Sequence, residues 1–230
     1  MIDHQNITFL EYLHRWLSQR PQVTLTDIIP DPAKAAFFAV DITNGFCYAG
    51  ALASPRVATI VQPTVDLMTR AWKAGVRHYL LFQDTHEPEA TEFSQFPPHC
   101  VRGTPEAETV DAIKALPFYQ AMLTYPKNSI DSTAGTGLLD WLTNHPEIDR
   151  FIVTGDCTDL CTYQLAMSLR LQANAHQLER KVYLPIECVQ TYDLSVEVAE
   201  KIGAMPHPGD FFHLTFLYHM QLNGIEVIHL

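Results

Sequence analysis

The sequence has 230 residues, of which 47% are hydrophobic, and its 15 basic and 26 acidic side chains give a formal net charge of −11. These values are typical of a soluble globular protein that is long enough to bury a sizeable core. They disfavour nucleic acid as a partner, because binding to a phosphate backbone relies on clustered positive charge and the chain has no basic run.

The N-terminal segment, MIDHQNITFLEYLHRW, lacks the basic start, apolar run and cleavage site of a signal peptide. The longest apolar stretch, AAFFAV at 35–40, is too short to span a bilayer. Five irregularly spaced cysteines do not form a disulfide framework for a chain of this size. We therefore expect a cytoplasmic protein with free thiols and no membrane partner.

The first predicted element is a helix at about residues 8–20, because Leu10, Leu13 and Leu17 fall on one of its faces. A proline-containing connector follows. We interpret residues 1–34 as a helical extension that packs on a single domain formed by residues 35–230, since no internal repeat or break in composition occurs.

Within this domain, short runs rich in β-branched and aromatic residues alternate with helix-like segments. The predicted strands are 36–42, 76–83, 118–125, 149–155, 181–189 and 225–230. The predicted helices are about 57–74, 106–115, 136–144, 160–176, 194–203 and 210–222. Pro63 should kink the first helix or mark a restart. This alternation predicts an α/β fold with three α/β/α layers and a six-stranded, mostly parallel sheet.

Unusual residues stand where these strands end, which is where parallel sheets collect their reactive groups. The first strand ends in Asp41 of VDITNGFC, the second in Asp84 of QDTH, and the third runs into Lys127 of YPKNS. Taken alone, Asp41 is interpreted as a cap or turn residue and Lys127 as a solvated surface lysine. Their joint placement beside a cysteine-containing fourth strand end, TGDCTDLC, favours a functional site.

Cys157 and Cys161 lie four positions apart in this segment. A zinc clip would need two more soft ligands, but Cys47, Cys100 and Cys188 supply no matching Cys-x-x-Cys pair. A redox pair would favour a spacing one residue shorter. An inert buried role stays open for one of the two. The nucleophile interpretation favours Cys161, because it falls where a helix is predicted to begin.

A cysteine amidase needs a thiolate, a proton shuttle and donors for the developing oxyanion. We expect the helix N-terminus and the ammonium group of Lys127 to lower the pKa of Cys161. Asp41 could then take the thiol proton and return it to departing ammonia. These three residue types are sufficient for amide hydrolysis.

A second cluster lies in QDTHEPEATEFSQFPPHC, where Asp84, His86 and His99 surround Glu92. Asp-x-His places two ligands on one short segment, and a histidine after a Pro-Pro turn can close a divalent metal site. The spacing is no fixed zinc signature and the chain has 11 histidines. A polar loop without a metal is therefore an equally open interpretation.

Together these segments resemble the nicotinamidase branch of the isochorismatase-like cysteine hydrolases, from about Ala35 to the C-terminus. The resemblance implies a Rossmann-like fold with a catalytic triad formed by Asp41, Lys127 and Cys161. It also implies a cis peptide bond at Asp156–Cys157 and an oxyanion hole made by the backbone N–H groups of Cys157 and Cys161. The implied reaction is metal-dependent hydrolysis of nicotinamide to nicotinate and ammonia through a thioester, in pyridine nucleotide salvage.

The resemblance further implies that a divalent metal holds the pyridine nitrogen. Its expected ligands are Asp84, His86 and His99, with Glu92 as a further candidate. Zinc comes first among the metals, with iron, manganese and magnesium as alternatives. Two aromatic side chains are expected to sandwich the ring, namely Phe46 and Phe96.

One departure concerns the usual family start, Asp-x-Gln-x-Asp-Phe, which is DITNGF at 41–46 here and leaves the hydrogen bonds around Asp41 open. Alternatives are a hydrolase of the same fold acting on isochorismate or on a ureido or carbamoyl compound, and a non-catalytic member of the fold. A nucleotide-binding Rossmann protein is disfavoured, because no G-x-G-x-x-G follows the first strand. The sequence leaves homo-oligomer formation open.

Overall fold

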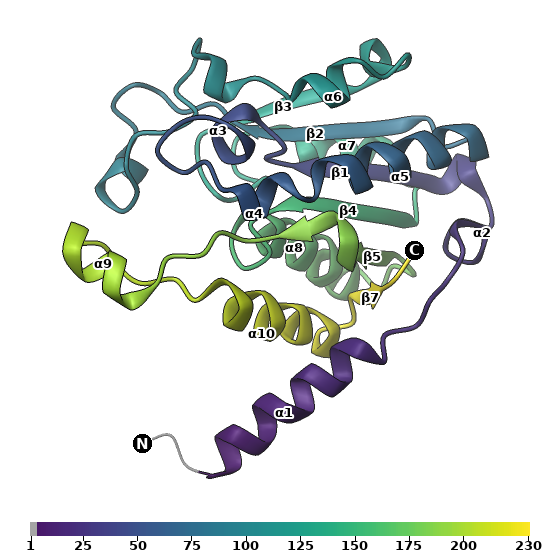
Figure 1. Cartoon of the computed structure of the whole chain (residues 1–230). Helices are drawn as coiled ribbons and strands as arrows, with labels where there is room; N and C mark the ends of the chain where they lie inside the picture. Colours follow the sequence, from purple (N-terminus) through teal and green to yellow (C-terminus); the bar gives the residue numbers. More distant parts are fainter. Residues whose placement is uncertain (1–3) are drawn as a thin grey trace.

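A computed structural model describes residues 4–230. The chain forms a parallel sheet with helices on both faces (Figure 1). The strands are β1 (Ala35–Val40), β2 (His78–Asp84), β3 (Leu123–Lys127), β4 (Arg150–Asp156), β5 (Lys181–Pro185), β6 (Val189–Gln190) and β7 (Glu226–Ile228). Their order is β3-β2-β1-β4-β5-β7, with the short β6 beside β4, and each of these pairings is parallel. The predicted α/β class is confirmed, with one strand more than expected.

The helices of the described chain are α1 (His4–Ser18), α2 (Leu25–Ile28), α3 (Asn44–Cys47), α4 (Pro55–Ala58), α5 (Val61–Ala74), α6 (Asp111–Lys114), α7 (Leu138–Asn144), α8 (Cys161–Ala175), α9 (Val196–Ile202) and α10 (Gly209–Leu222). Every residue of β1 is buried, because side chains from its two faces enter two separate cores. One core contains Phe37 and residues of α5, and the other contains Phe38 and residues of α7, α8 and α10. No described helix is long and apolar enough to cross a membrane.

The N-terminal helix α1 lies against α10, on the outside of the second core (Figure 1). Its Trp16 is 6% exposed and meets Tyr218 of α10 edge-to-face, with ring centroids 5.1 Å apart. The division of the chain at residue 34 into extension and domain stays a prediction.

Several element boundaries differ from the sequence prediction. The strand predicted at 181–189 is divided into β5, a 3-10 turn at Ile186–Cys188, and β6. The helix predicted at 57–74 is divided into α4 and α5, and Pro63 lies in the first turn of α5, where no intrahelical N–H bond is required. The segment 106–115 is α-helical only in α6, after a 3-10 turn at Pro105–Ala107, because Thr109 pairs with the loop after β1 and Val110 donates a backbone hydrogen bond to Ile42. The third strand begins at Leu123, after a 3-10 turn at Tyr119–Ala121.

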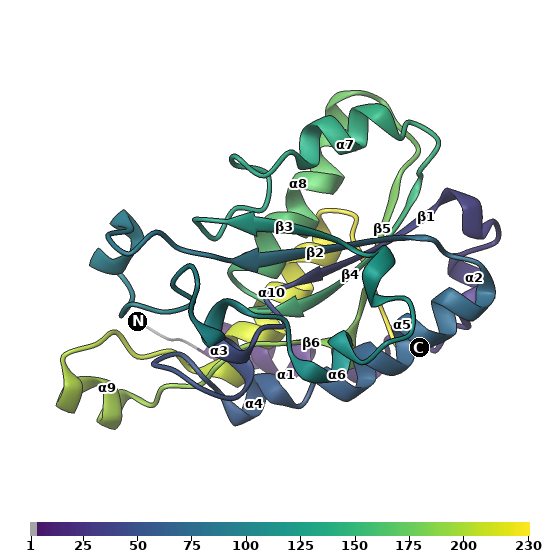
Figure 2. The same ribbon diagram turned by 90° about the horizontal axis from the view of Figure 1, so that it is seen from above.

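The sheet has its topological switch point between β1 and β4, because the chain runs outward from β1 through β2 to β3 and then returns to the other side of β1 (Figure 2). The loops after β1 and β4 therefore diverge and leave a crevice at the carboxyl ends of the strands. Gly155 of β4 has φ +123° and faces Val40 of β1, where an added Cβ would run into the Val40 carbonyl oxygen. Glycine thus allows these two strand ends to lie close together.

Candidate active site

Lys127 is the centre of the buried site at this crevice. Its Nζ lies 2.7 Å from Asp41 Oδ2, donates to Asp84 Oδ1 and to the Ser129 carbonyl oxygen, and lies 3.6 Å from Cys161 Sγ. All four residues of this cluster are at most 5% exposed, namely Asp41, Asp84, Lys127 and Cys161. A carboxylate oxygen of each aspartate and the Cys161 sulfur all lie within 4.8 Å of one another. The folded chain thus brings the three predicted triad residues together from the ends of β1 and β3 and from the start of α8.

The local conformation aims Asp41 into this cluster. Asp41 follows β1 with φ +55°, a left-handed conformation that aspartate adopts more readily than most residues. Its Oδ1 accepts the backbone N–H of Asp84 at 2.7 Å, which leaves Oδ2 facing Lys127. These are the contacts of Asp41 that the unusual sequence DITNGF had left open.

Burial and neighbouring charges set the protonation of these groups. Burial and the charge of Asp84 raise the pKa of Asp41 to about 6, although Lys127 opposes the shift. Burial disfavours the ammonium form of Lys127, but the carboxylates of Asp41 and Asp84 outweigh it and hold its pKa well above the ordinary value. Burial, with the charge of Asp41, raises the pKa of the Cys161 thiol well above its ordinary value against the pull of Lys127. This reverses our expectation of a lowered pKa for Cys161, because complete burial outweighs one cation.

The turn after β4 presents the candidate nucleophile. The Asp156–Cys157 peptide bond is cis, as the resemblance implied. The Cys157 carbonyl oxygen accepts backbone N–H groups from Leu160 at 3.0 Å and from Thr162 at 3.1 Å. Cys161 is the first residue of α8, so its own N–H lies in the first turn, where helices leave amides without an intrahelical acceptor.

The predicted metal ligands also converge. Asp84 Oδ2 lies 3.5 Å from His86 Nε2 and 3.6 Å from His99 Nε2, and Glu92 Oε1 lies 3.9 Å from His86 Nε2. Asp84 therefore faces Lys127 with one oxygen and the two histidines with the other. His86 and His99 are 0% and 3% exposed.

These residues fit a divalent metal. Two ligands about 2.1 Å from a tetrahedral metal lie roughly 3.4 Å apart, which is close to the separations of Asp84 Oδ2 from the two imidazole nitrogens. The His99 Nδ1 lies 2.9 Å from the Pro97 carbonyl oxygen, so Nδ1 carries the proton and Nε2 offers a lone pair. His86 Nε2 is buried without a hydrogen-bond partner. One carboxylate oxygen and two imidazole nitrogens suit zinc, iron or manganese.

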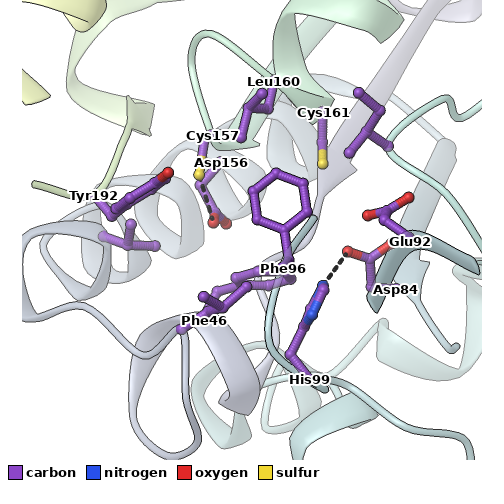
Figure 3. Close-up of a pocket in the computed structure, with 13 residues that line it drawn as sticks. Phe46, Asp84, Glu92, Phe96, His99, Asp156, Cys157, Leu160, Cys161 and Tyr192 are labelled. Carbon is purple, nitrogen blue, oxygen red and sulfur yellow. Dashed lines mark hydrogen bonds and ion pairs between the residues drawn. The ribbon is translucent and has the colours of Figure 1, made fainter. Parts of the chain in front are cut away.

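A cavity with about 440 Å³ of empty space opens beside both clusters (Figure 3). Its lining combines apolar side chains with acidic, imidazole and thiol groups: Phe46, Leu52, Val57, Asp84, Glu92, Phe96, His99, Ile130, Asp156, Cys157, Leu160, Cys161 and Tyr192. The two predicted aromatic residues thus line the same cavity as the candidate nucleophile. Asp41, Lys127 and His86 do not line it and are buried against residues that do.

Two residues of the cavity wall, Asp156 and Tyr192, have no role predicted from the sequence. Asp156 is 0% exposed and its Oδ1 has no hydrogen-bond partner, while burial and the charge of Asp41 raise its pKa well above the ordinary value. Tyr192 comes from the segment before α9 and stacks on His207, with ring centroids 3.8 Å apart. His207 Nε2 lies 2.8 Å from Asp159 Oδ2, which links this segment to the nucleophile turn. Asp156 could have been predicted as a site residue from its place after Gly155 at the end of a strand, but no sequence pattern indicates Tyr192.

Comparison with known proteins identifies the family of this chain. Residues 35–205 match the family model described as the isochorismatase domain. The chain is 30% identical over 210 residues to nicotinamidase 1 of Arabidopsis thaliana, covering 82% of this chain and 83% of that protein. It is 32% identical over 145 residues to the nicotinamidase/pyrazinamidase of Mycobacterium tuberculosis, covering 57% of this chain and 76% of the relative.

A solved structure shares the fold. The pyrazinamidase of Pyrococcus horikoshii in complex with zinc superposes with a TM-score of 0.64 at 22% identity, covering 86% of this chain and 99% of that one. The matched domain spans well over half of the sequence, and the Arabidopsis relative is similar along most of its length. The chain therefore belongs to the isochorismatase family, within its nicotinamidase-like branch of amide-hydrolysing enzymes.

Proposed function

We propose that this enzyme hydrolyses nicotinamide to nicotinate and ammonia through a thioester on Cys161. The observation that carries the proposal is the position of Lys127, whose ammonium group contacts Asp41, Asp84 and the Cys161 sulfur at once. Asp84 in turn joins the triad to the two histidines. A base, a thiol and a candidate metal centre thereby share one buried network beside the aromatic cavity.

In the first half-reaction, Asp41 takes the Cys161 proton as Sγ attacks the carboxamide carbon. The backbone N–H groups of Cys157 and Cys161 hold the oxyanion. Asp41 then gives the proton to the departing nitrogen, and ammonia leaves as the carbon–nitrogen bond breaks. An acid with a pKa near 6 suits both steps, because it can accept and return a proton near neutral pH.

In the second half-reaction, Asp41 removes a proton from water, which attacks the thioester carbonyl carbon. The carbon–sulfur bond breaks, the proton on Asp41 returns to Cys161, and the acid product loses its carboxyl proton to solvent as nicotinate. Lys127 stays charged throughout and offsets the negative charge that moves between Asp41 and the sulfur. Phe46 and Phe96 hold the pyridine ring.

Asp84, His86 and His99 would hold the divalent metal, with Glu92 within reach of the same centre. When bound, the metal supplies a Lewis acid that can coordinate the pyridine nitrogen and orient the substrate. Zinc is the first candidate, since these ligand types and separations suit it.

Ammonia release from nicotinamide tests the choice of sulfur. We expect Cys161→Ala to lower kcat by at least about 10³-fold, because the nucleophile is removed. The matched variant Cys157→Ala should keep a measurable share of the turnover, since Cys157 contributes a backbone N–H. Equal ammonia release by the wild type and Cys161→Ala would refute the proposal, and a dead Cys157→Ala with an active Cys161→Ala would mean that the nucleophile is Cys157.

A further inference from the structure

Asn128 contacts one of the candidate metal ligands, His86, and is not itself one of them. It follows Lys127 at the end of β3, and its Oδ1 lies 3.2 Å from Nδ1 of the buried His86. The same oxygen accepts the backbone N–H of Glu87 at 3.1 Å. Two neighbouring residues of one strand end therefore reach different partners, because Lys127 enters the triad while Asn128 holds a histidine ring.

These contacts decide which ring nitrogen of His86 carries the proton. A flipped Asn128 amide would place its NH2 group against the N–H of Glu87, so the atom at this position is the oxygen. An amide oxygen only accepts hydrogen bonds, so His86 Nδ1 must be the donor. The neutral imidazole then has its lone pair on Nε2, the nitrogen that lies 3.5 Å from Asp84 Oδ2 and lacks a hydrogen-bond partner.

We propose that Asn128 is a positioning residue that orients His86 and presents its Nε2 lone pair to the metal. This inference rests on the metal centre of the proposed function. The two histidines differ in this respect, since His99 Nδ1 is held by a backbone carbonyl, that of Pro97. His86 is thus the histidine whose orienting group a side-chain substitution can remove. Outer partners of this kind fix the ring and raise the basicity of the ligand.

The experiment measures the zinc dissociation constant by competition with a chromophoric chelator, with no substrate present. We expect Asn128→Leu to weaken zinc binding by about 10- to 100-fold. Asn128→Asp keeps an oxygen acceptor at the same place, so its zinc dissociation constant should be at most about threefold that of the wild type. The control is Asn174→Leu, an exposed asparagine whose Oδ1 accepts from Arg170 and which should leave zinc affinity unchanged.

A double-mutant cycle tests whether Asn128 acts through His86. In the His86→Ala background, Asn128→Leu should add less than about twofold to the loss of affinity, because the ring that it orients is gone. An equal loss in both backgrounds, an unchanged affinity of Asn128→Leu, or an Asn128→Asp protein as weak as Asn128→Leu would overturn the inference. Thermal unfolding of the metal-free proteins shows that each variant is folded, and Asn128→Ala replaces the leucine variant if that one is not.

The outcomes separate this inference from the proposed function. The expected zinc affinities in a protein that leaves nicotinamide intact would support the role of Asn128 and refute the proposed reaction. A wild type that releases ammonia from nicotinamide but shows no effect of Asn128→Leu on zinc affinity would leave the reaction standing and overturn the inference. A wild type that does not bind zinc would overturn it as well.

Discussion

At the scale of single residues, the buried ammonium group of Lys127 defines the site. A lysine side chain that is fully removed from water is costly unless its charge is paired. Here two buried carboxylates, Asp41 and Asp84, lie against it, so that the ammonium group stabilises both of them while they repel each other. The same arrangement leaves Asp41 with a pKa of about 6, near the value that a general acid and base needs.

Removing this charge should damage both activity and stability. We expect Lys127→Met to lower kcat/KM by at least about 10²-fold, since Asp41 loses the positive charge that keeps its pKa from rising further. Two buried carboxylates would also be left unpaired, so the free energy of unfolding in urea should fall by about 3 kcal/mol or more.

The matched control is Lys201→Met, because Lys201 pairs with Glu197 at 2.6 Å on the surface, with both side chains more than 60% exposed. This variant should change the free energy of unfolding by less than about 1 kcal/mol. Similar losses in the two variants would contradict the role given to burial.

At the scale of elements, the site depends on how closely the ends of β1 and β4 approach. Gly155 allows this approach, and the cis peptide and the start of α8 follow directly after it. The turn is also held by Thr158, whose N–H donates to Gln190 of β6 and whose hydroxyl group lies 2.9 Å from His213 Nδ1 of α10. Strand β6 and helix α10 thereby fix the nucleophile turn from its outer side.

Substitution of Gly155 by alanine tests the strand contact. The new methyl group would meet the Val40 backbone, and alanine is strained at φ +123°, so we expect a loss of at least about 3 kcal/mol in unfolding free energy, or no folded protein. Gly203→Ala is the control, because Gly203 has φ +71° but open space around it, and it should cost about 1 kcal/mol. Equal costs would show that backbone strain alone, without the strand contact, explains the glycine.

The contact between α10 and the turn should make stability depend on pH. Burial, with the positive charge of Arg56, lowers the pKa of His213 to about 4, although Asp159 and Asp210 oppose the shift. The unfolded chain takes up this proton near pH 6.5 and the folded chain only near pH 4, so the unfolded state binds more protons between these values. His213 therefore lowers the free energy of unfolding as the pH falls from about 6.5 to about 4.

Urea unfolding of His213→Asn across this range measures the effect, since asparagine keeps a polar partner for Thr158 but does not titrate. The stability of the wild type relative to this variant should decline as the pH is lowered from 6.5 to 4. His176→Asn, at the exposed end of α8, is the control. Parallel profiles for the wild type and His213→Asn would contradict the assignment.

At the scale of the whole molecule, the candidate metal centre connects the carboxyl end of β2 to the long loop between β2 and β3. Asp84 closes β2, while Glu92 and His99 come from that loop, so a metal would tie the loop to the core. His86 and Val101 already form a backbone bridge across the base of the loop. Metal binding should therefore affect both the catalytic site and the stability of the fold.

Metal removal distinguishes the proposed reaction from its rivals. We expect chelation to abolish nicotinamide turnover or to raise KM sharply, with recovery on addition of zinc. Turnover of isochorismate or of a ureido or carbamoyl compound that chelation leaves unchanged would instead favour one of these rival reactions.

Thermal unfolding gives a second measure of the same centre. Zinc at about 100 times its dissociation constant should stabilise the protein by about 2.7 kcal/mol and raise Tm by roughly 5 to 10 °C. His99→Ala should lose most of this shift, because it removes one of the three ligands. A Tm increase of the same size in His99→Ala would place the zinc elsewhere.

The sequence by itself determined the fold class and most of the chemistry, because both depend on local patterns. Buried strand runs such as AAFFAV predicted the parallel sheet, and the polar residues that end those runs, Asp41, Asp84 and Lys127, identified the crevice edge. The predictions for 106–115 and 118–125 were wrong in part. Pairing of Thr109 and Val110 with the loop after β1 overrides local helix preference in the first segment, and a 3-10 turn at Tyr119–Ala121 precedes β3 in the second.

Only the tertiary structure decided which partners each site residue contacts and how burial shifts its pKa. Sequence spacing cannot show that Asp84 faces Lys127 with one oxygen and two histidines with the other, or that Tyr192 and Asp156 complete the cavity wall. It also predicted the wrong direction for the pKa of Cys161, which complete burial raises. Charge interactions depend on burial and on distances between residues far apart in the chain, and folding alone fixes these.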